Sequence, residues 1–531
     1  MDTFQLDLDK SGCCSSLIED YNNNKETATQ FVKYPFAFEQ FEQVIRDKAE
    51  SYKMDRALLA KVIHEQYQHH ETLQAVKDNI ELLRQANTFT ITTAHQPILF
   101  TGPLFFIYKI MGAINTAAML REQYPDSHFV PVFWMGSEDH DFEEINHTYV
   151  YGNPVYWQRD GNGAVGRMST EGIDHSISDL EDILKNRDGG ADQILELFKE
   201  AYNKFERFDQ ATHYLVDRLF SRFGLVIIIG DDARLKDRYK DIMEDEILNQ
   251  RVQQVTESTL AKMEDHYKVQ ANPRDINVFY LTEDNRERLV MNDDGTIQTA
   301  DKTCTFSQHQ LKEEIAAHPE RFSPNVMLRP LYQDTLLPNL AYVGGGGELS
   351  YWMEQRPVFE HYGVNYPMLI LRNSVLWLDK GSRKKLNKFW LKEEDLFRDE
   401  DQLINSYIEK HARDEISLSE EKKELEELYN SILSRAEGID VTLKKTVLGE
   451  QQKQLKALDK LEGKLLKAEK NKHDEAVNQL RHLKQKLFPQ GELQERVENF
   501  LSQYIIHGDA FFTILQEQLD PFQKSFLIIK K

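Results

Sequence analysis

The chain has 531 residues, and 65 Lys and Arg against 88 Asp and Glu leave a net charge of −23. At roughly 100–200 residues per domain, this length predicts two to four domains and a large buried core. The acidic balance argues against a general nucleic-acid-binding protein, because such proteins neutralise phosphates with Lys and Arg.

No basic segment followed by an apolar stretch opens the chain, so the sequence shows no secretory signal. The longest apolar runs, such as residues 225–229, are too short to cross a bilayer. Cys13, Cys14 and Cys304 form neither a disulfide framework nor a zinc motif. We therefore expect a cytoplasmic protein with reduced thiols and no membrane contact.

The first part of the chain is predicted to be helical. Apolar and charged residues recur at helical spacing over 36–51 and 55–87, without strand-like alternation. This pattern predicts an N-terminal helical segment, 1–87, that packs on the core. Residues 89–93 are then rich in β-forming residues, and Pro103 begins an apolar helix that is expected to run to Leu120.

Continuous apolar segments recur between helical segments, at 129–134, 225–229, 326–328 and 368–371. Strands that are apolar throughout and alternate with helices indicate a parallel sheet that is covered on both faces. The sequence therefore predicts an α/β fold with a Rossmann-like, doubly wound catalytic core over 88–390. We expect insertions at 150–210 and 250–325, a small β-element over 277–298, and a glycine-rich loop over 342–348.

Beyond residue 390 the helical pattern returns. Leu418, Leu425, Leu428 and Ile432 fall on one stripe, and a second stripe runs over 458–487 with coiled-coil spacing and one slip near Lys472. These stripes predict an antiparallel coiled-coil arm over 391–490, and a C-terminal helical segment, 491–531, that returns to the core. The second helix is rich in lysine, which indicates a solvated coiled-coil face or, alternatively, a partner surface or an anion site.

Ligands bind beyond the carboxyl ends of the strands in an open parallel sheet, so residues that follow the predicted strands are site candidates. The candidate substrate- or nucleotide-binding residues are His95, Gln96, Thr101, Gly102, Lys109, Ser137, Arg329, Tyr332, Asn339, Gly344, Gly345, Glu348, Arg372 and Asn373.

His95 stands just before a predicted helix start, whose free N–H groups suit a phosphate or a carboxylate. His95 could stabilise charge that develops on a transferred phosphate, with support from Lys109. An ordinary strand–turn–helix joint explains this segment equally well, since it matches neither the Walker loop nor the dinucleotide-binding motif.

Glu138, Asp139, His140 and Asp141 form the densest polar cluster and are the candidate catalytic residues. Such side chains could hold a substrate ammonium group, act as a general base or bind a divalent metal, and structural capping is a further explanation. A metal would need more ligands, and we predict no tightly bound metal.

The glycines of 344–347 would permit positive φ and a close approach of backbone to an anion or nucleotide, although a tight turn is an equal alternative. Arg329 and Arg372 are candidate forks for an anion, with ordinary ion pairs as the alternative.

Several segments resemble the bacillithiol-biosynthesis cysteine-adding enzymes, the cysteine ligase family. The matching strings are LFTGPL at 99–104, SEDHDFEE at 137–144, LRPLYQ at 328–333, LPNLAYVGG at 337–345, PVFEHYGV at 357–364 and LQERVENF at 493–500. The resemblance covers nearly the whole chain in order, and it departs from the family's usual pattern at Ala94-His95 and at Gly346-Gly347.

This resemblance implies a Rossmann-like core related to class I synthetases, and a homodimer formed through the coiled coil. It implies a ligase that joins L-cysteine to glucosaminyl-malate by an amide bond, in the last step of bacillithiol biosynthesis. We expect ATP, with Mg²⁺, to activate the cysteine carboxylate, and Arg329 or Arg372 to hold the malate carboxylates. Two alternatives stay open: a metal-dependent hydrolase acting on a sugar amide, and a non-catalytic coiled-coil scaffold.

Overall fold

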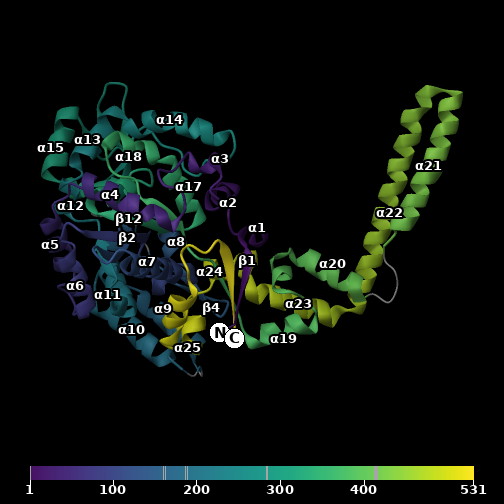
Figure 1. Cartoon of the computed structure of the whole chain (residues 1–531), viewed down its shortest axis with the longest axis horizontal. Coiled ribbons are helices and arrows are strands. Elements are labelled where there is room, and N and C mark those ends of the chain that lie inside the picture. The colour runs from purple at the N-terminus through teal and green to yellow at the C-terminus, as the bar shows by residue number, and fades with distance from the viewer. Residues whose placement is uncertain are drawn as a thin grey trace. The chain divides into compact units, whose positions relative to one another are not determined.

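The computed structural model describes residues 2–159, 161, 163–185, 187, 189–282, 285–411 and 417–531. The chain divides into two compact units (Figure 1). The larger unit comprises Gln5–Leu376 with Glu492–Leu527, and the smaller comprises Met1–Phe4, Trp377–Gly491 and Ile528–Lys531.

A five-stranded parallel sheet in the order β13-β12-β2-β3-β6 forms the centre of the larger unit. Its strands are β2 (Thr88–His95), β3 (His128–Met135), β6 (Val226–Ile229), β12 (Asn339–Gly344) and β13 (Met368–Leu371). Within this sheet the chain first forms the middle strand, β2, then adds β3 and β6 on one side and later β12 and β13 on the other. The switch point therefore lies between β2 and β12. The predicted Rossmann-like, doubly wound fold is confirmed.

Helices cover both faces of this sheet, and β2 and β3 are accordingly buried along almost their whole length. The apolar helix α7 (Leu104–Gln123) crosses β2, β3 and β12, while α4 (Phe41–Ser51) contacts β12 and α5 (Arg56–Gln66) contacts β6 (Figure 1). Within the described ranges, α7 alone is long and apolar enough to cross a membrane, but most of it is buried in the core. It is therefore the central core helix of the fold.

Further helices of the larger unit complete the N-terminal region and the first insertion. They are α1 (Leu8–Ser11), α2 (Ser16–Asn22), α3 (Glu26–Thr29), α6 (Gln74–Leu82), α8 (Phe142–Ile145), α9 (Ile173–Leu184), α10 (Ala191–Lys204) and α11 (Phe208–Phe220). A small hairpin of β4 (His147–Val150) and β5 (Asn153–Tyr156) precedes α9.

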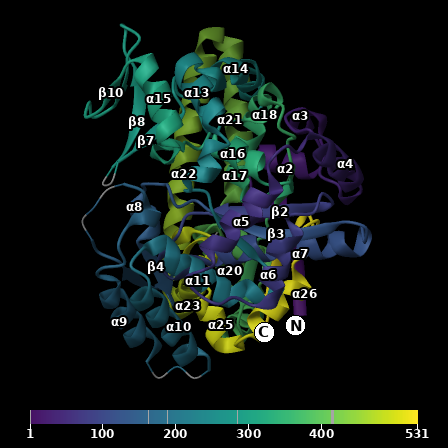
Figure 2. The same cartoon turned by 90° about the vertical axis from the view of Figure 1, so that its left-hand side faces the viewer.

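The predicted β-element of the second insertion is confirmed as an antiparallel sheet of order β10-β9-β8-β7-β11, with β8, β7 and α15 visible together in Figure 2. The strands are β7 (Val278–Leu281), β8 (Arg286–Met291), β9 (Ile297–Thr299), β10 (Thr305–Phe306) and β11 (Phe322–Pro324). The neighbouring helices are α12 (Ala233–Asp237), α13 (Lys240–Asn249), α14 (Arg251–Glu264) and α15 (Gln308–Ala317).

The fourth strand of the parallel sheet does not lie where the sequence pattern placed it. Residues 326–328 form a turn before α16 (Arg329–Leu336), and the strand is β12, which ends inside the segment that the sequence predicts to be the glycine-rich loop. Pro338 and Asn339 look like loop residues, yet Asn339 is satisfied inside the core by Asp334 and Thr92. Hydrogen bonds with nearby Asp334 and with Thr92, on the neighbouring strand, therefore allow a strand that the apolar pattern does not reveal.

The larger unit closes with α17 (Gly346–Glu354), α18 (Arg356–Tyr362), α24 (Gln494–Val497), α25 (Leu501–His507) and α26 (Ala510–Gln518). α24 and α26 contact α7. A separate three-stranded sheet has the order β1-β15-β14, made of Asp2–Asp7, Ser525–Lys530 and Val375–Leu378. Residues 2–7 and 525–530 are thus strands where helices were expected, and the second of these is a buried apolar run typical of a strand.

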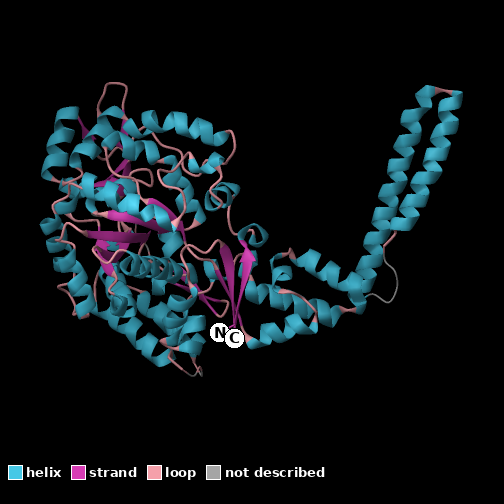
Figure 3. Cartoon of the chain, in the orientation of Figure 1, coloured by secondary structure: helices cyan, strands magenta, loops and turns pink. Residues whose placement is uncertain are grey.

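The smaller unit is helical apart from the strand residues at its ends (Figure 3). It contains α19 (Lys380–Lys388), α20 (Glu400–His411), α21 (Ser419–Ile439), α22 (Lys444–Lys472) and α23 (Asp474–Leu487). α21 and α22 lie side by side as an antiparallel hairpin, which confirms the predicted coiled-coil domain. The predicted slip near Lys472 is a break at His473, where α22 ends and α23 begins.

Candidate active site

A cavity of about 680 Å³ lies at the carboxyl ends of the strands that flank the switch point. His95 comes from the end of β2, Glu138 and Asp139 from the segment after β3, and Gly347 and Glu348 from the first turn of α17. The predicted candidates that line it are His95, Gln96, Lys109, Glu138, Asp139, Arg329, Tyr332 and Glu348.

A buried lysine from α7 fixes the first turn of α17. The ammonium of Lys109 donates to both oxygens of Glu348, at 2.7 and 2.8 Å, and to the carbonyl of Ala94. The hydroxyl of Tyr342 also donates to Glu348, at 2.6 Å. Burial opposes ionisation of Glu348, but Lys109 outweighs burial and lowers the pKa of this carboxyl below its usual value. Glu348 is therefore an ionised residue whose position is set by two neighbours.

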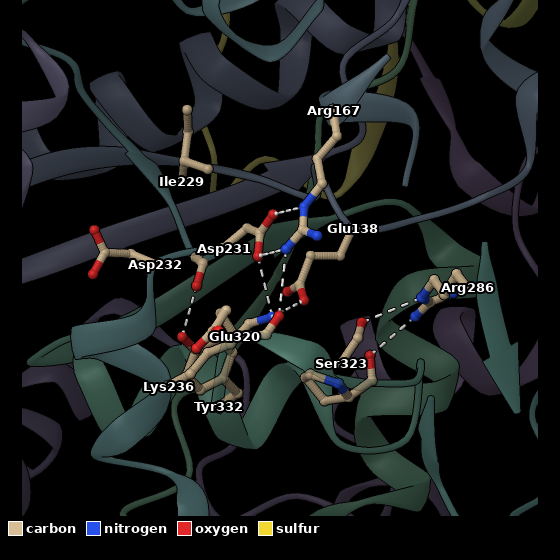
Figure 4. Close-up of polar contacts among 12 residues, drawn as sticks. Glu138, Arg167, Ile229, Asp231, Asp232, Lys236, Arg286, Glu320, Ser323 and Tyr332 are labelled. Atoms are coloured by element: carbon tan, nitrogen blue, oxygen red, sulfur yellow. Dashed lines mark hydrogen bonds and ion pairs between the residues drawn. The ribbon is translucent and has the colours of Figure 1, made fainter. Parts of the chain in front are cut away.

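A second buried lysine connects two acidic residues (Figure 4). The Nζ atom of Lys236 lies 2.5 Å from Glu138 and 3.1 Å from Asp231, and Arg167 forms a two-pronged pair with Asp231 at 2.7 Å. Both cations also donate to the carbonyl of Glu320. Burial acts to raise the pKa of Asp231, but Lys236 and Arg167 lower it overall. The network holds Glu138 at the cavity wall.

Asp139 lies within a group of donors on the same wall. The amide of Gln96 donates to Asp139 at 2.8 Å and to Glu144 at 3.2 Å. Arg286, from β8, lies 3.6 Å from Asp139 and 2.9 Å from the ring of His140. Burial would raise the pKa of Asp139, but the hydrogen bond from His140 and the charge of Arg286 lower it. Asp139 is therefore ionised at neutral pH.

Two arginines bring positive charge to the cavity without acidic partners. The guanidinium of Arg329 donates to the neutral side chains of Gln333 and Tyr351, at 3.1 and 3.4 Å. Arg274 also lines the cavity and is exposed. Within the described ranges, neither guanidinium has a carboxylate within ion-pair distance. Both are free to bind an anionic ligand.

His95 is a neutral imidazole in this setting. Burial and the charge of Lys109 lower its pKa from 6.5 to about 4, and its Nδ1 atom lies 3.0 Å from the carbonyl of Gln96. At neutral pH it can donate or accept a hydrogen bond, but it carries no charge to stabilise a phosphate.

The predicted anion site at the start of α7 is covered by the C-terminal segment. The N–H of Leu104 donates to the carbonyl of Glu498 at 2.8 Å, and the amide of Asn499 donates to the carbonyl of Gly102 at 2.7 Å. Thr101 is fully buried beside them. Thr101 and Gly102 are therefore structural residues outside the cavity lining.

The structure also places Arg372 outside the cavity lining. Its guanidinium is buried, donates to Glu495 at 2.8 Å and to the carbonyl of Asn373 at 3.1 Å, and lies over the ring of Phe105. The ordinary ion pair, the alternative left open by the sequence, describes Arg372. The side-chain amide of Asn373 donates a hydrogen bond to the carbonyl of Asp520, at 2.8 Å.

Other candidates have structural roles as well. Asn339 belongs to the core network of β12, and Ser137 is buried with its carbonyl bound to Gly166. Asp141 caps α8 by accepting from the N–H of Glu144, and Gly344 and Gly345 lead into α17. The glycines of 344–347, all within the described chain, do not adopt positive φ, so that part of the expectation is wrong, and Gly346 and Gly347 instead form the first turn of α17.

Sequence reasoning missed residues that the tertiary fold brings in. Lys236 lies on α12, five residues after Asp231, and this short spacing in the sequence could have indicated that the two residues pair. Arg274 and Arg286 come from the second insertion and have no local pattern that connects them with β3. Among the residues that the structure describes, no three His, Cys, Asp or Glu side chains are arranged to hold a metal ion.

Comparison with known proteins gives a consistent result. Residues 1–373 match the family model described as the bacillithiol biosynthesis BshC N-terminal Rossmann-like domain, and 375–531 match the BshC C-terminal coiled-coil domain. A protein of Flavobacterium johnsoniae named "putative cysteine ligase BshC" is 38% identical over the full length of both chains. Proteins of the same name from Flavobacterium psychrophilum and Christiangramia forsetii are also 38% identical, covering 100% and 97% of this chain and 100% and 96% of their own.

Proposed function

This chain belongs to the BshC family of bacillithiol biosynthesis, and on this premise we propose that it is a cysteine ligase. The proposed reaction forms an amide bond between the carboxyl group of L-cysteine and the amine of glucosaminyl-malate, with ATP and Mg²⁺, in the cytoplasm. It would be the last step of bacillithiol synthesis.

The observation that carries this proposal is the separation of charge within one cavity. Asp139 is ionised on one wall, while Arg329 and Arg274 bring guanidinium groups that have no acidic partner in the described chain. Glucosaminyl-malate carries an amine and two carboxylates, and guanidinium groups match carboxylates in geometry and charge. We assign the malate carboxylates to Arg329 and Arg274, and the ammonium to Asp139.

Glu138 is the proposed general base for the sugar amine. The amine must lose a proton before it attacks an acyl carbon, and Glu138 lies on the same wall as Asp139. Lys236 and Asp231 are positioning residues, because they fix Glu138 without lining the wall on which the amine would lie. Asp141, which was an equal candidate in the sequence, is occupied by its helix cap.

The first turn of α17 suits the phosphates of a nucleotide. Gly347 lines the cavity there, and helix N-termini present free N–H groups with a partial positive charge. Lys109 and Tyr342 hold Glu348, so the turn is preorganised. ATP bound at this position would supply the leaving group that makes the cysteine carboxyl group reactive.

Incubation of the protein with L-cysteine and glucosaminyl-malate, with and without ATP and Mg²⁺, tests the proposal. Mass spectrometry should detect the amide product only when ATP is present. Absence of product under both conditions would contradict a ligase of this kind. Chelator-sensitive cleavage of a sugar amide without ATP would instead support the hydrolase alternative.

We also propose a homodimer that forms through the coiled coil. Several large apolar side chains of the α21–α22 hairpin are exposed, among them Leu428 (56%), Leu461 (50%), Leu465 (42%) and Ile432 (40%). Exposed apolar residues that gather on one element mark interaction surfaces. A second copy of the same hairpin is the partner with the matching pattern.

A further inference from the structure

Two adjacent cysteines lie near the beginning of the larger unit, and the reaction proposed above makes no use of them. Cys13 and Cys14 form the turn between α1 and α2, and both are partly exposed, free thiols. Their Sγ atoms are 3.4 Å apart. A disulfide needs about 2.05 Å between its sulfur atoms, so a small rearrangement of this turn would bring the two sulfurs to bonding distance.

The two thiols differ in reactivity because their surroundings differ. The thiol of Cys14 donates to the sulfur of Cys13, the hydroxyl of Ser11 lies 2.9 Å from that sulfur, and Arg372 adds positive charge nearby. These groups lower the pKa of Cys13 below its usual value, although burial opposes them. The hydrogen bond to Cys13 and burial raise the pKa of Cys14. Because the thiolate is the reactive form, Cys13 is the nucleophile of the pair.

Helix α2 connects this turn with the first turn of α17. The two helices contact each other (Figure 1), and the side chain of Ile18, at the start of α2, lies against Gly346, the first residue of α17. Near the other end of α2, the hydroxyl of Tyr21 donates to the carbonyl of Leu369 in β13, at 2.8 Å. This bond fixes one end of α2, so a distortion at the cysteines acts on the end that packs against α17.

A disulfide between adjacent residues is strained. Neighbouring Cα atoms are about 3.8 Å apart across a trans peptide bond, which is shorter than the roughly 4.4–6.8 Å found in ordinary disulfides. Strained disulfides are reduced easily, and such labile bonds are typical of regulatory sites. Oxidation of Cys13 and Cys14 would therefore be reversible, and it would distort the backbone directly before α2.

We propose that Cys13 and Cys14 form a redox switch, which the disulfide of a low-molecular-weight thiol oxidises to a vicinal disulfide and which acts through α2 on the first turn of α17. Oxidation loosens this turn and weakens the binding of a nucleotide there. The effect on the nucleotide rests on the proposed function, whereas the oxidation of the pair and the response of α17 do not.

The oxidation proceeds by two thiol–disulfide exchanges. The thiolate of Cys13 attacks one sulfur of the small disulfide RSSR, whose S–S bond breaks, and RS⁻ leaves and takes up a proton. Cys14 then loses its proton to solvent and attacks the sulfur of Cys13, which expels the second RS⁻ and closes the ring. The two cysteines together lose two electrons, and RSSR is reduced to two RSH.

Mass spectrometry of the full-length protein tests the oxidation. Reduced protein, freed of reductant, is treated with bis(2-hydroxyethyl) disulfide, and the remaining thiols are alkylated with iodoacetamide. The peptide that contains Cys13 and Cys14 should be unalkylated and lighter by two hydrogens than its reduced form, while Cys304 should be alkylated. Alkylation of both Cys13 and Cys14, or a stable mixed disulfide on Cys13, would overturn the proposal.

Serine variants test the order of the two steps. Cys14→Ser should accumulate the mixed disulfide on Cys13, because the nucleophile remains and the resolving thiol is lost. Cys13→Ser should react at least about tenfold more slowly than the wild type, and Cys304→Ser, the matched control, should react at the wild-type rate. Thermal unfolding checks that the variants are folded. Faster reaction in Cys13→Ser than in Cys14→Ser would contradict the assignment of the nucleophile.

Hydrogen exchange measures the response of α17. The N–H of Leu349 donates to the carbonyl of Gly345 in the first turn, at 3.0 Å. In the oxidised wild type, the backbone amides of residues 349–352 should exchange at least about tenfold faster than in the reduced protein. Cys13→Ser, treated with the same disulfide, should show no change. Equal exchange in the reduced and oxidised wild type would overturn the switch.

Calorimetric titration with ATP and Mg²⁺ separates this inference from the proposed function. If both hold, oxidation raises the Kd for ATP at least about tenfold in the wild type but not in Cys13→Ser, and dithiothreitol restores it. If the reduced protein binds no ATP but oxidation still changes the exchange of α17, the proposed nucleotide site fails and the switch stands. If ATP binds with the same Kd in both redox forms, the switch fails alone.

Discussion

Neighbouring residues of the acidic cluster have different roles because the backbone turns between them. Asp139 lines the cavity and is held by Gln96 and Arg286, whereas Asp141 turns to cap α8. Glu138 turns toward Lys236. Composition alone makes these carboxylates equivalent, and only their partners distinguish a substrate-binding group from a capping group.

Asp139 and Asp141 form a matched pair for mutation. We expect Asp139→Asn to lower product formation at least about a hundredfold, because it removes the charge proposed to hold the substrate ammonium. Asp141→Asn should retain activity within about threefold, since asparagine also caps helices well. Rates measured with purified, folded variants check the pair, and equal losses in both would contradict the assignment of roles.

Arg329 and Arg372 form a second matched pair. Arg372→Gln leaves Glu495 buried without its cation, which costs about 3–5 kcal/mol of unfolding free energy. Arg329→Gln should cost about 1 kcal/mol or less, because no acidic partner within the described ranges is lost. Its effect should instead be a KM for glucosaminyl-malate raised at least about tenfold. Chemical denaturation and kinetics together check both halves of this prediction.

At the scale of elements, α17 connects the cavity with the second insertion. Its first turn carries Glu348, and its last residue, Glu354, accepts the N–H groups of Gln270 and Ala271 at 2.6 and 3.0 Å. Gln270 and Ala271 line the cavity. One helix therefore positions the proposed phosphate-binding turn and a segment of the opposite wall.

This tether predicts a dependence of stability on pH. Burial raises the pKa of Glu354 from 4.5 to about 7, so the folded state binds its proton more tightly than the unfolded chain does. The contribution of Glu354 to stability is then fully present below pH 4.5 and is lost as the pH rises through 7. Relative to Glu354→Gln, the wild type should lose about 3 kcal/mol across this window.

Urea unfolding at several pH values measures this difference directly. The subtraction of the variant removes the titration of all other groups, provided that both proteins unfold in two states. A difference between wild type and Glu354→Gln that does not change between pH 4.5 and 7 would show that the carboxyl group titrates normally.

At the scale of the whole molecule, the charge of −23 is unevenly distributed. The lysine-rich hairpin is compensated locally, since several of its lysines pair with acidic residues of the smaller unit: Lys422 with Glu462, Lys444 with Glu437, and Lys453 with Glu450. This pairing favours a solvated coiled-coil surface over an anion site. The apolar residues of the hairpin remain exposed in the single chain.

The homodimer proposal leads to a measurement of mass in solution. We expect light scattering to give twice the mass of one chain for the wild type, and the mass of one chain for Leu461→Lys combined with Leu465→Lys. The control is Lys460→Glu, an exposed charged position on the same helix, which should stay dimeric. A monomeric wild type would contradict the proposal.

The sequence by itself determined the doubly wound core and the coiled-coil hairpin, because apolar runs and heptad spacing are local patterns with a direct physical meaning. It also indicated the rim of the sheet, where His95, Glu138 and Asp139 were found. Strand β12 was hidden, since Asn339 is tolerated in the core through hydrogen bonds with Asp334, five residues away, and with Thr92, on a strand that is distant in the sequence.

Only the tertiary structure decided which charged residues are free. Arg329 and Arg372 look alike in the sequence, yet Glu495, more than a hundred residues away, neutralises only Arg372. Lys236 and Arg286 likewise meet the acidic cluster only in the folded chain. Lys236 comes from α12 and pairs with Glu138, and Arg286 comes from the second insertion and lies near Asp139. The charge available to a substrate is the charge left after all internal partners are counted, and those partners are set by the packing of distant segments.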